Sequence, residues 1–318
     1  MNGENEDIRH PRNLQGLLRF AMEATIAEDA PERDRHFEQM DPERRQFLED
    51  ALKALTIDVI EQLQKSSQTI GSDSASEDEK LDALETILNY IDDIDTACDF
   101  CKIGGLFVLS ECLTSSHTKI RSKAALLIAE LAQNNPYCQK ALLEADILPK
   151  LMNLLCENET STDGLRAISC LVRNYEPCLA AFIDIGGLEC LLGCLLKTDN
   201  EKLITRAIFL VNSLCNEFPS VRDELIKLKI SNFILPIIRP KAEYDILLEI
   251  ALSALCLFTE NDEVSSKCKS PEFNLRSQLD EIIQIAGDKP ECKETVQYSE
   301  VLLKRLFDSK SDIETTDR

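Results

Sequence analysis

The sequence predicts an all-α solenoid, and a repeated pattern carries most of that prediction. Four Ala- and Leu-rich segments align on leucines that are 40, 43 and 43 residues apart: Leu131, Leu171, Leu214 and Leu257. A second set of residues opens hydrophobic stretches at spacings of 42, 40 and 43: Gly105, Ile147, Gly187 and Ile230. A period of about 40–47 residues with two or three helices per unit indicates HEAT or armadillo repeats, which stack into a curved array.

The turns inside each unit favour three helices over two. Residues 99–106 and 181–188 are near copies, and each ends a short helix, passes through Gly-Gly and starts the next helix. Prolines follow three of the shared leucines by five or six residues, where a long helix must stop: Pro136, Pro177 and Pro219. We therefore expect about four three-helix armadillo repeats over 97–262, wound into a right-handed superhelix with a concave face.

Helical segments are also expected on the N-terminal side of the repeats. Residues 1–40 read as a flexible segment with a short amphipathic helix over 13–24. Asp41 and Pro42 indicate the start of another helix, which carries apolar residues from Phe47 to Leu63 on one face. Together with a helix from Leu81 to about Asp95, it forms the predicted capping helices of 41–96.

Two polar stretches are predicted to be flexible, and helices are predicted between the repeats and the second stretch. The Ser- and acid-rich stretch 65–80 is predicted to be a flexible connector within the N-terminal cap. After the repeats, residues 263–307 are predicted to be helices that cap the open end of the stack. Residues 308–318 are expected to be a disordered tail.

Composition restricts the compartment and the partners. The chain has 318 residues and a formal charge of −22, so nucleic acid and membrane surfaces are unfavourable partners. No secretory signal and no run of about 18 apolar residues is seen. Thirteen cysteines, most of them inside apolar stretches, indicate a reducing compartment, and we expect a cytoplasmic protein. Cys98 and Cys101 have CxxC spacing, but they lack the further ligands of a zinc site.

The sequence gives no sign of an enzyme. Its only histidines are His10, His36 and His117, and none has neighbours that form a catalytic triad or a metal-binding set. Phosphate-binding glycine loops and the HExxH motif are absent from the sequence. We therefore expect a binding protein with no cofactor and no metal.

Several segments resemble one known family. Residues 13–18 read Asn-Leu-Gln-Gly-Leu-Leu and are followed by Ala21 and Met22, while residues 167–173 read Ala-Ile-Ser-Cys-Leu-Val-Arg. Together with 43–48, 99–101 and the closing 317–318, they are similar to the cytosolic heat-shock protein 70-binding proteins, which are armadillo-type nucleotide exchange factors. The resemblance runs from about residue 13 to the C-terminus. The shorter, more acidic N-terminus departs from the Gly- or Pro-rich leader of some members.

The resemblance implies a co-chaperone, and we expect the chain to be a monomer. Its concave face would clasp the second lobe of the chaperone's nucleotide-binding domain and promote ADP release. An N-terminal segment would aid substrate release, and the matching residues are Asn13, Leu14, Gln15, Gly16, Leu17 and Leu18. The same leucines could instead cap the first repeat.

Candidate binding residues lie on the third helix of each unit, which lines the concave surface of armadillo arrays. Arg173 is the foremost candidate, because its planar guanidinium can bind a partner carboxylate through two hydrogen bonds. Alternatively, Arg173 is solvated or paired with Glu176 or with a neighbouring repeat. The full predicted set is Glu130, Gln133, Asn134, Arg173, Asn174, Arg206, Asn212 and Asn216.

Two other functions remain open at this point. The chain could be an armadillo adaptor that holds an extended peptide or regulates a chaperone-associated ubiquitin ligase. Transport-type armadillo grooves present regularly spaced Trp and Asn, and this chain has no Trp. An enzyme is the third and least supported alternative.

Overall fold

A computed structural model describes residues 58–196 and 200–308, in which all regular elements are helices. The predicted helix over 13–24, the segment Asn13–Leu18, the helix start at Asp41 and the tail from 309 lie outside the described residues. From residue 58 on, the helices α3 (Val59–Ile70) and α4 (Glu77–Leu88) precede the repeats.

The repeats are units of three helices. Unit 1 contains α5 (Ile94–Lys102), α6 (Gly105–Cys112) and α7 (Thr118–Ala132). Unit 2 contains α8 (Pro136–Glu144), α9 (Leu148–Cys156) and α10 (Ser161–Val172). Unit 3 contains α11 (Glu176–Asp184), α12 (Gly187–Cys194) and α13 (Glu201–Glu217). Unit 4 contains α14 (Pro219–Lys227), α15 (Ser231–Ile234) with the 3₁₀ turn η1 (Leu235–Ile237), and α16 (Ile246–Phe258).

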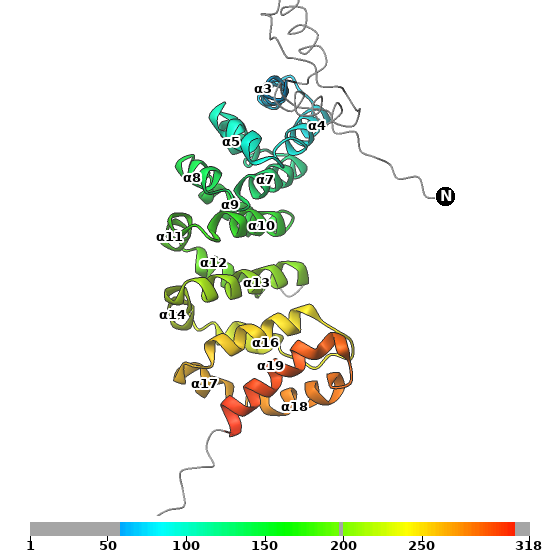
Figure 1. Cartoon of the computed structure of the whole chain (residues 1–318), viewed down its shortest axis with the longest axis vertical. Coiled ribbons are helices and arrows are strands. Elements are labelled where there is room, and N and C mark those ends of the chain that lie inside the picture. Colours follow the sequence, from blue (N-terminus) through cyan, green and yellow to red (C-terminus); the bar gives the residue numbers. More distant parts are fainter. Residues whose placement is uncertain (1–57, 197–199, 309–318) are drawn as a thin grey trace, which may run out of the picture.

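The predicted C-terminal cap has the arrangement of a fifth unit. It consists of α17 (Asp262–Cys268), α18 (Leu275–Ala286), the 3₁₀ turn η2 (Pro290–Cys292), α19 (Lys293–Leu303) and the π-helical turn η3 (Lys304–Asp308). Helix α19 packs on α16 as α16 packs on α13, so the last helices continue the stack while closing its end (Figure 1).

The third helices form one continuous layer. Helices α4, α7, α10, α13, α16 and α19 each pack on the next, and they lie one below another in Figure 1. We call the outward face of α7, α10, α13, α16 and α19 the third-helix surface. The first helices of the units, α5, α8, α11, α14 and α17, form the left-hand edge in Figure 1. The three-helix solenoid predicted from the sequence is thereby confirmed.

Three of the four marker leucines lie in the core, and the fourth was placed two residues too late. Leu131, Leu171 and Leu214 are fully buried, whereas Leu257 is only partly buried. Its place is taken by Leu255, which is fully buried and lies 41 residues after Leu214. Unit 4 has no proline close after its third helix, and without that marker the sequence aligns Leu257 in place of Leu255.

The predicted turns between first and second helices are confirmed. Gly104 and Gly186 have φ of 87° and 78°, in the left-handed region that costs glycine least. A Cβ at Gly105 would lie 2.3 Å from the Phe100 ring, so that ring occupies the space beside the glycine. Gly187 and Phe182 repeat this arrangement, and a Cβ there would lie 2.4 Å from the ring.

The prolines begin helices as well as following them. Pro136, Pro177 and Pro219 lie in the first turn of α8, α11 and α14, where the missing N–H would have had no partner within the helix. The proline therefore marks the boundary between one unit and the next.

The flexible connector predicted over 65–80 is wrong in its extent. Lys65 to Ile70 belong to α3, and the Ser76 side chain with Glu79 forms a capping box that starts α4 at Glu77. A Ser and an acid three residues apart are a helix-start signal, which was mistaken for flexible composition. Two helix bounds also differ from the prediction. Helix α3 begins after its N-cap Asp58, within the helix expected from Phe47 to Leu63. Helix α4 ends at Leu88, whereas the expected helix ran to about Asp95.

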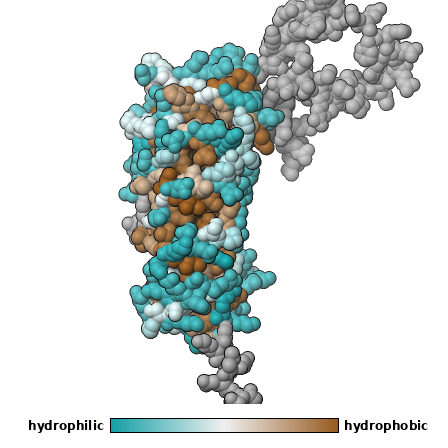
Figure 2. Space-filling view, turned by 90° about the vertical axis from the view of Figure 1, so that its left-hand side faces the viewer, coloured by the Kyte–Doolittle hydropathy of each residue, from teal (hydrophilic) through white to brown (hydrophobic). Residues whose placement is uncertain are grey.

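The side of the first helices carries an apolar area. Figure 2 looks onto this side and shows hydrophobic residues gathered over the middle of the stack, with hydrophilic ones over its C-terminal end. Exposed apolar side chains here include Tyr137 on α8 and Ile185 after α11. Within 58–196 and 200–308, no single helix is long and apolar enough to cross a membrane. Among these residues, only the bent pair α11–α12 has the required length and apolar composition when its two helices are combined.

Candidate partner-binding surface

The predicted site residues lie on the third helices or directly after their C-terminal ends. In α13, the residues buried in the core include Ala207, Leu210 and Leu214, so residues that fall between them in the helical period face outward. Arg206 and Asn216 lie on that outward stripe, and both are exposed. These two residues therefore face solvent, while their role in binding stays a prediction.

Four of the eight predicted residues line one hollow between the C-terminal ends of α7 and α10, the third helices of units 1 and 2. Its volume is about 260 Å³. Two arginines give it positive charge, and we call it the arginine hollow. It is lined by Gln133, Asn134, Arg166, Cys170, Arg173 and Asn174.

Arg173 is at the surface, and no acidic side chain among the described residues pairs with it. It is the C-cap of α10 and is partly exposed, with its guanidinium over the ring of Phe209 on α13, 5.9 Å from the centroid. Such stacking orients the cation while leaving its edge free to donate hydrogen bonds. Within the described part of the chain Arg173 forms no ion pair, so the predicted alternative of a pair with Glu176 is not realised.

A buried glutamine fixes the backbone beneath Arg173. Gln139 of α8 is 1% exposed, and its Nε2 lies 3.0–3.1 Å from the carbonyl oxygens of Cys170, Leu171 and Arg173. The carbonyls at a helix C-terminus have no partner within the helix. The two amide hydrogens of Gln139 are shared among these three acceptors and fix the end of α10.

Three predicted residues join neighbouring units. Glu130 accepts a hydrogen bond from Arg166 at 2.6 Å, which ties α7 to α10. Arg206 Nη1 donates to the Thr162 carbonyl at 3.0 Å, which ties α13 to the start of α10. Asn212, described below, ties α13 to α16. The partner-binding role predicted for these side chains thus has to coexist with a structural one.

Asn134 and Asn174 have a backbone role that the sequence analysis missed. Their φ values are 53° and 58°, in the left-handed region that Asn tolerates better than most residues. Each forms the turn between a third helix and the next first helix. The backbone N–H of Asn174 also donates to Glu217 at 3.4 Å. Both side chains remain exposed at the rim of the arginine hollow.

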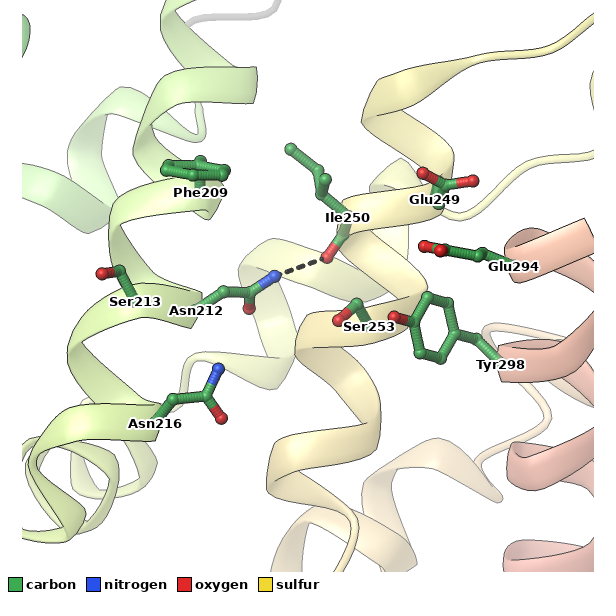
Figure 3. Close-up of a pocket in the computed structure, with 9 residues that line it drawn as sticks. All are labelled: Phe209, Asn212, Ser213, Asn216, Glu249, Ile250, Ser253, Glu294 and Tyr298. Carbon is green, nitrogen blue, oxygen red and sulfur yellow. Dashed lines mark hydrogen bonds between the residues drawn. The ribbon is translucent and has the colours of Figure 1, made fainter. Parts of the chain in front are cut away.

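A second hollow lies between α13, α16 and α19 (Figure 3). Its volume is about 320 Å³. Two glutamates and two aromatic rings distinguish it from the first, and we call it the acidic hollow. It is lined by Phe209, Asn212, Ser213, Asn216, Glu249, Ile250, Ser253, Glu294 and Tyr298.

The acidic hollow is rich in hydrogen-bond acceptors. Asn212 Nδ2 donates to the Ile250 carbonyl at 3.1 Å, while its Oδ1 is shielded from solvent and has no donor among the described residues. Glu249 accepts hydrogen bonds from the Tyr244 hydroxyl at 3.2 Å and from Thr295 at 3.4 Å. Burial and the negative charges of Glu249 and Glu294 raise the pKa of Tyr244. This end of the surface therefore suits a donor-rich cation.

Phe209 connects the two hollows, and it was not predicted. Its ring lies under Arg173, lines the acidic hollow and is 54% exposed. The signal was present in the sequence, because Phe209 is an apolar residue on the outward stripe between Arg206 and Asn216. Arg166, seven residues before Arg173 on the same helix face, could have been found by the same counting.

The remaining sequence motifs form no metal-binding group. Within 58–196 and 200–308, no three His, Cys, Asp or Glu side chains are arranged to hold a metal ion. His117 Nδ1 lies 2.9 Å from Glu77 at an exposed position. Cys98 and Cys101 lie on α5, where their thiols approach α8.

Comparison with known proteins gives the family. Residues 96–229 match the family described as the SIL1/FES1/HPBP1 C-terminal domain, and residues 14–100 match the family described as nucleotide exchange factor Fes1. The chain is 30% identical to human Hsp70-binding protein 1 over 96% of its own length and 88% of that protein. It is 24% identical to the Hsp70 nucleotide exchange factor FES1 of Coccidioides immitis (strain RS), over 66% of this chain and 98% of that one.

Solved structures agree on the fold. A designed armadillo repeat protein superposes with a TM-score of 0.62 and 18% sequence identity, over 77% of this chain and 99% of the designed one. The repeat architecture, together with relatives that span nearly the whole chain, shows that the protein belongs to the armadillo-type Hsp70 nucleotide exchange factor family of Hsp70-binding protein 1 and Fes1.

Proposed function

We propose that this chain binds the nucleotide-binding domain of heat-shock protein 70 and accelerates the release of ADP. The third-helix surface clasps the second lobe of that domain. The chain acts as a monomer in the cytoplasm and is not an enzyme, because it changes no covalent bond. The observation that carries this proposal is Arg173, which stacks on exposed Phe209 at the centre of the surface and has no acidic partner among the described residues.

The charges of the two hollows support a defined orientation of the partner. The arginine hollow offers the guanidinium group of Arg173 to a partner carboxylate, while Arg166 beside it already pairs with Glu130. A charge-assisted arginine–carboxylate pair is among the stronger hydrogen bonds. The acidic hollow offers Glu249 and Glu294 to a partner Lys or Arg. A partner turned end for end would bring like charges together, which strongly disfavours the wrong pose.

The mechanism requires no chemistry from this chain. A nucleotide bound between two lobes contacts both, so a protein that prefers the displaced lobe arrangement weakens nucleotide binding. The size of the effect is limited by the difference between its affinities for the two arrangements. ADP leaves, ATP enters, and the chaperone releases its substrate.

The N-terminal residues have a separate part in this proposal. Asn13–Leu18 engage the peptide-binding groove of the chaperone and help to expel its substrate. The segment is apolar, short and tethered to the bound solenoid, so its effective concentration near the chaperone is high. Deletion of residues 1–40 should preserve ADP release and slow the release of a bound peptide.

The deciding experiment measures the release of a fluorescent ADP analogue from purified heat-shock protein 70 by stopped flow. We expect the chain to accelerate release. Arg173→Ala should raise the concentration of the chain needed for half-maximal acceleration about tenfold, which corresponds to about 1.4 kcal/mol of binding free energy. The matched control is Arg222→Ala, because Arg222 lies on the first helix α14 and pairs with Glu260. Its effect should be small.

Each outcome has a distinct meaning. Acceleration that is equal in both variants would retain the function and remove Arg173 from the contact surface. No acceleration at saturating chain would contradict the proposed exchange activity. The alternative would then be an armadillo adaptor that binds an extended peptide or regulates a chaperone-associated ubiquitin ligase.

A further inference from the structure

Three cysteine thiols meet where unit 1 packs on unit 2, away from the third-helix surface. Cys98 and Cys101 lie on α5, and Cys138 lies on α8. The Sγ atoms of Cys101 and Cys138 are 3.5 Å apart, although the residues are 37 positions apart in the sequence. Cys98 Sγ lies 3.9 Å from Asn135 Oδ1 at the start of α8.

The repeat architecture explains this meeting. The first helices of units 1, 2 and 3 pack side by side, since α5 contacts α8 and α8 contacts α11. Residues three apart lie on the same side of a helix, so the CxxC spacing points both thiols of α5 toward α8. The spacing that suggested a metal site in the sequence thus places two thiols beside a third.

The two thiols in contact differ in environment. Cys138 is fully buried, whereas Cys101 is partly exposed and adjoins Lys102. The hydrogen bond with the Cys138 thiol, aided by the positive charge of Lys102 and opposed by burial, lowers the pKa of Cys101. The same contact and burial raise the pKa of Cys138. A partly exposed thiol with a lowered pKa is the one that oxidants reach first.

We propose that Cys101 and Cys138 form a reversible disulfide that joins unit 1 to unit 2, with hydrogen peroxide as the oxidant. The Cys101 thiolate attacks one peroxide oxygen, the O–O bond breaks, and the products are a sulfenic acid and, after protonation, water. The Cys138 sulfur then attacks the Cys101 sulfur, and the hydroxyl group leaves with the Cys138 proton as a second water. Two thiols lose two electrons in total, and a dithiol reductant returns them by exchange.

The geometry allows the bond with a small adjustment. A disulfide has a sulfur–sulfur distance of about 2.05 Å, so the two sulfur atoms must approach by about 1.5 Å. Rotation about χ1 of the partly exposed Cys101, with a slight approach of α5 to α8, provides such a movement. The bond would then fix the angle at which unit 1 stacks on unit 2.

A second thiol contact provides an internal comparison. Cys156 and Cys190 have sulfur atoms 3.9 Å apart, on α9 and α12 of adjacent units. This pair is farther apart and lacks a neighbour corresponding to Lys102 in sequence. We expect it to oxidise more slowly than Cys101 and Cys138.

The test maps disulfides in the full chain. The folded protein is treated with hydrogen peroxide, free thiols are blocked with an alkylating reagent, and the digested peptides are identified by mass spectrometry. We expect a peptide pair joined through Cys101 and Cys138, lighter by two hydrogens than the separate peptides and lost after dithiothreitol. Oxidation should also raise the melting temperature of the native chain, because a cross-link restricts the unfolded state.

Variants identify the thiols. Cys101→Ala and Cys138→Ala should abolish both the cross-link and the rise in melting temperature, whereas Cys98→Ala should retain both. Circular dichroism of each reduced variant checks that it folds. Full alkylation of Cys101 and Cys138 in the oxidised native chain would overturn the proposal, as would a dominant cross-link through Cys98. The result is independent of ADP release, so it stands or falls apart from the proposed chaperone function.

Discussion

Units 1 and 3 fill the turn between first and second helices differently from units 2 and 4. Units 1 and 3 have Gly105 and Gly187 there, each preceded by a Phe five residues earlier, at 100 and 182. Units 2 and 4 have an isoleucine instead and a leucine five residues earlier: Leu142 with Ile147, and Leu225 with Ile230. All eight residues are buried.

The comparison shows that the two residues five positions apart fill the space at this turn together. A large ring beside a glycine and two medium side chains fill similar volumes, and cores tolerate exchanges that conserve volume. A left-handed residue stands in this turn in all four units, because Gly104, Asp146, Gly186 and Lys229 have φ of 87°, 51°, 78° and 60°. The Phe/Leu position or the Gly/Ile position, compared alone, makes the four units look more different than their packing is.

The largest expected effect comes from emptying the turn of unit 2. Ile147→Gly removes a fully buried side chain and should lower the free energy of unfolding by about 4 kcal/mol, because it leaves a cavity. Adding Leu142→Phe should recover part of that loss, since it recreates the pair found in unit 1. Urea denaturation of the single and double variants measures both values. Additive effects of the two changes would contradict the volume exchange.

A methyl group added beside the ring of unit 3 should cost somewhat less. In Gly187→Ala the Cβ would lie 2.4 Å from Phe182 carbons, so we expect a loss of about 2–3 kcal/mol. The control is Gly193→Ala in the same helix, where no atom lies within 4 Å of the added Cβ. That variant should change stability by less than about 1 kcal/mol in either direction. Equal losses in the two variants would remove the role of the ring.

The backbone part of the turn can be isolated at Gly104. Nothing lies within 4 Å of a Cβ built there, so Gly104→Ala tests the left-handed conformation alone. We expect a loss of about 1–2 kcal/mol, measured by thermal or urea unfolding. An unchanged midpoint would show that α5 and α6 can turn without a positive φ at this residue.

The smallest effect has the opposite sign. Asp146 is exposed and adopts φ of 51°, so Asp146→Gly relieves strain while adding freedom to the unfolded chain. A net gain of about 0.5 kcal/mol is expected. A loss in the same denaturation assay would mean that the Asp146 side chain supports the turn directly.

The sequence predicted the repeats because their signals are local. Gly-Gly turns and prolines depend on neighbouring residues within one helix or turn, and the leucine spacing repeats them from unit to unit along the chain. Where such a signal was missing, the prediction failed, as at Leu257, which stands where the structure buries Leu255. The connector over 65–80 failed for a related reason, since composition outweighed the short capping signal at Ser76 and Glu79.

The candidate site was predictable only as a surface. Helical period located the outward stripe that holds Arg206 and Asn216. It could not show that Asn212 reaches the Ile250 carbonyl, or that Phe209 lies beneath Arg173, because these contacts join helices of different units. The angle between units is set by packing across the whole layer, so the hollows between them appear only in three dimensions.

Gln139 carries a consequence for genetic screens of this protein. Its amide anchors the carbonyl of Arg173 from within the stack, at a depth that no partner reaches. A selection for weakened binding would therefore recover changes at Gln139 beside changes at Arg173. If Arg173 contacts the partner as proposed, changes at Gln139 would resemble lost contacts, although Gln139 only supports the backbone of Arg173 from inside the stack.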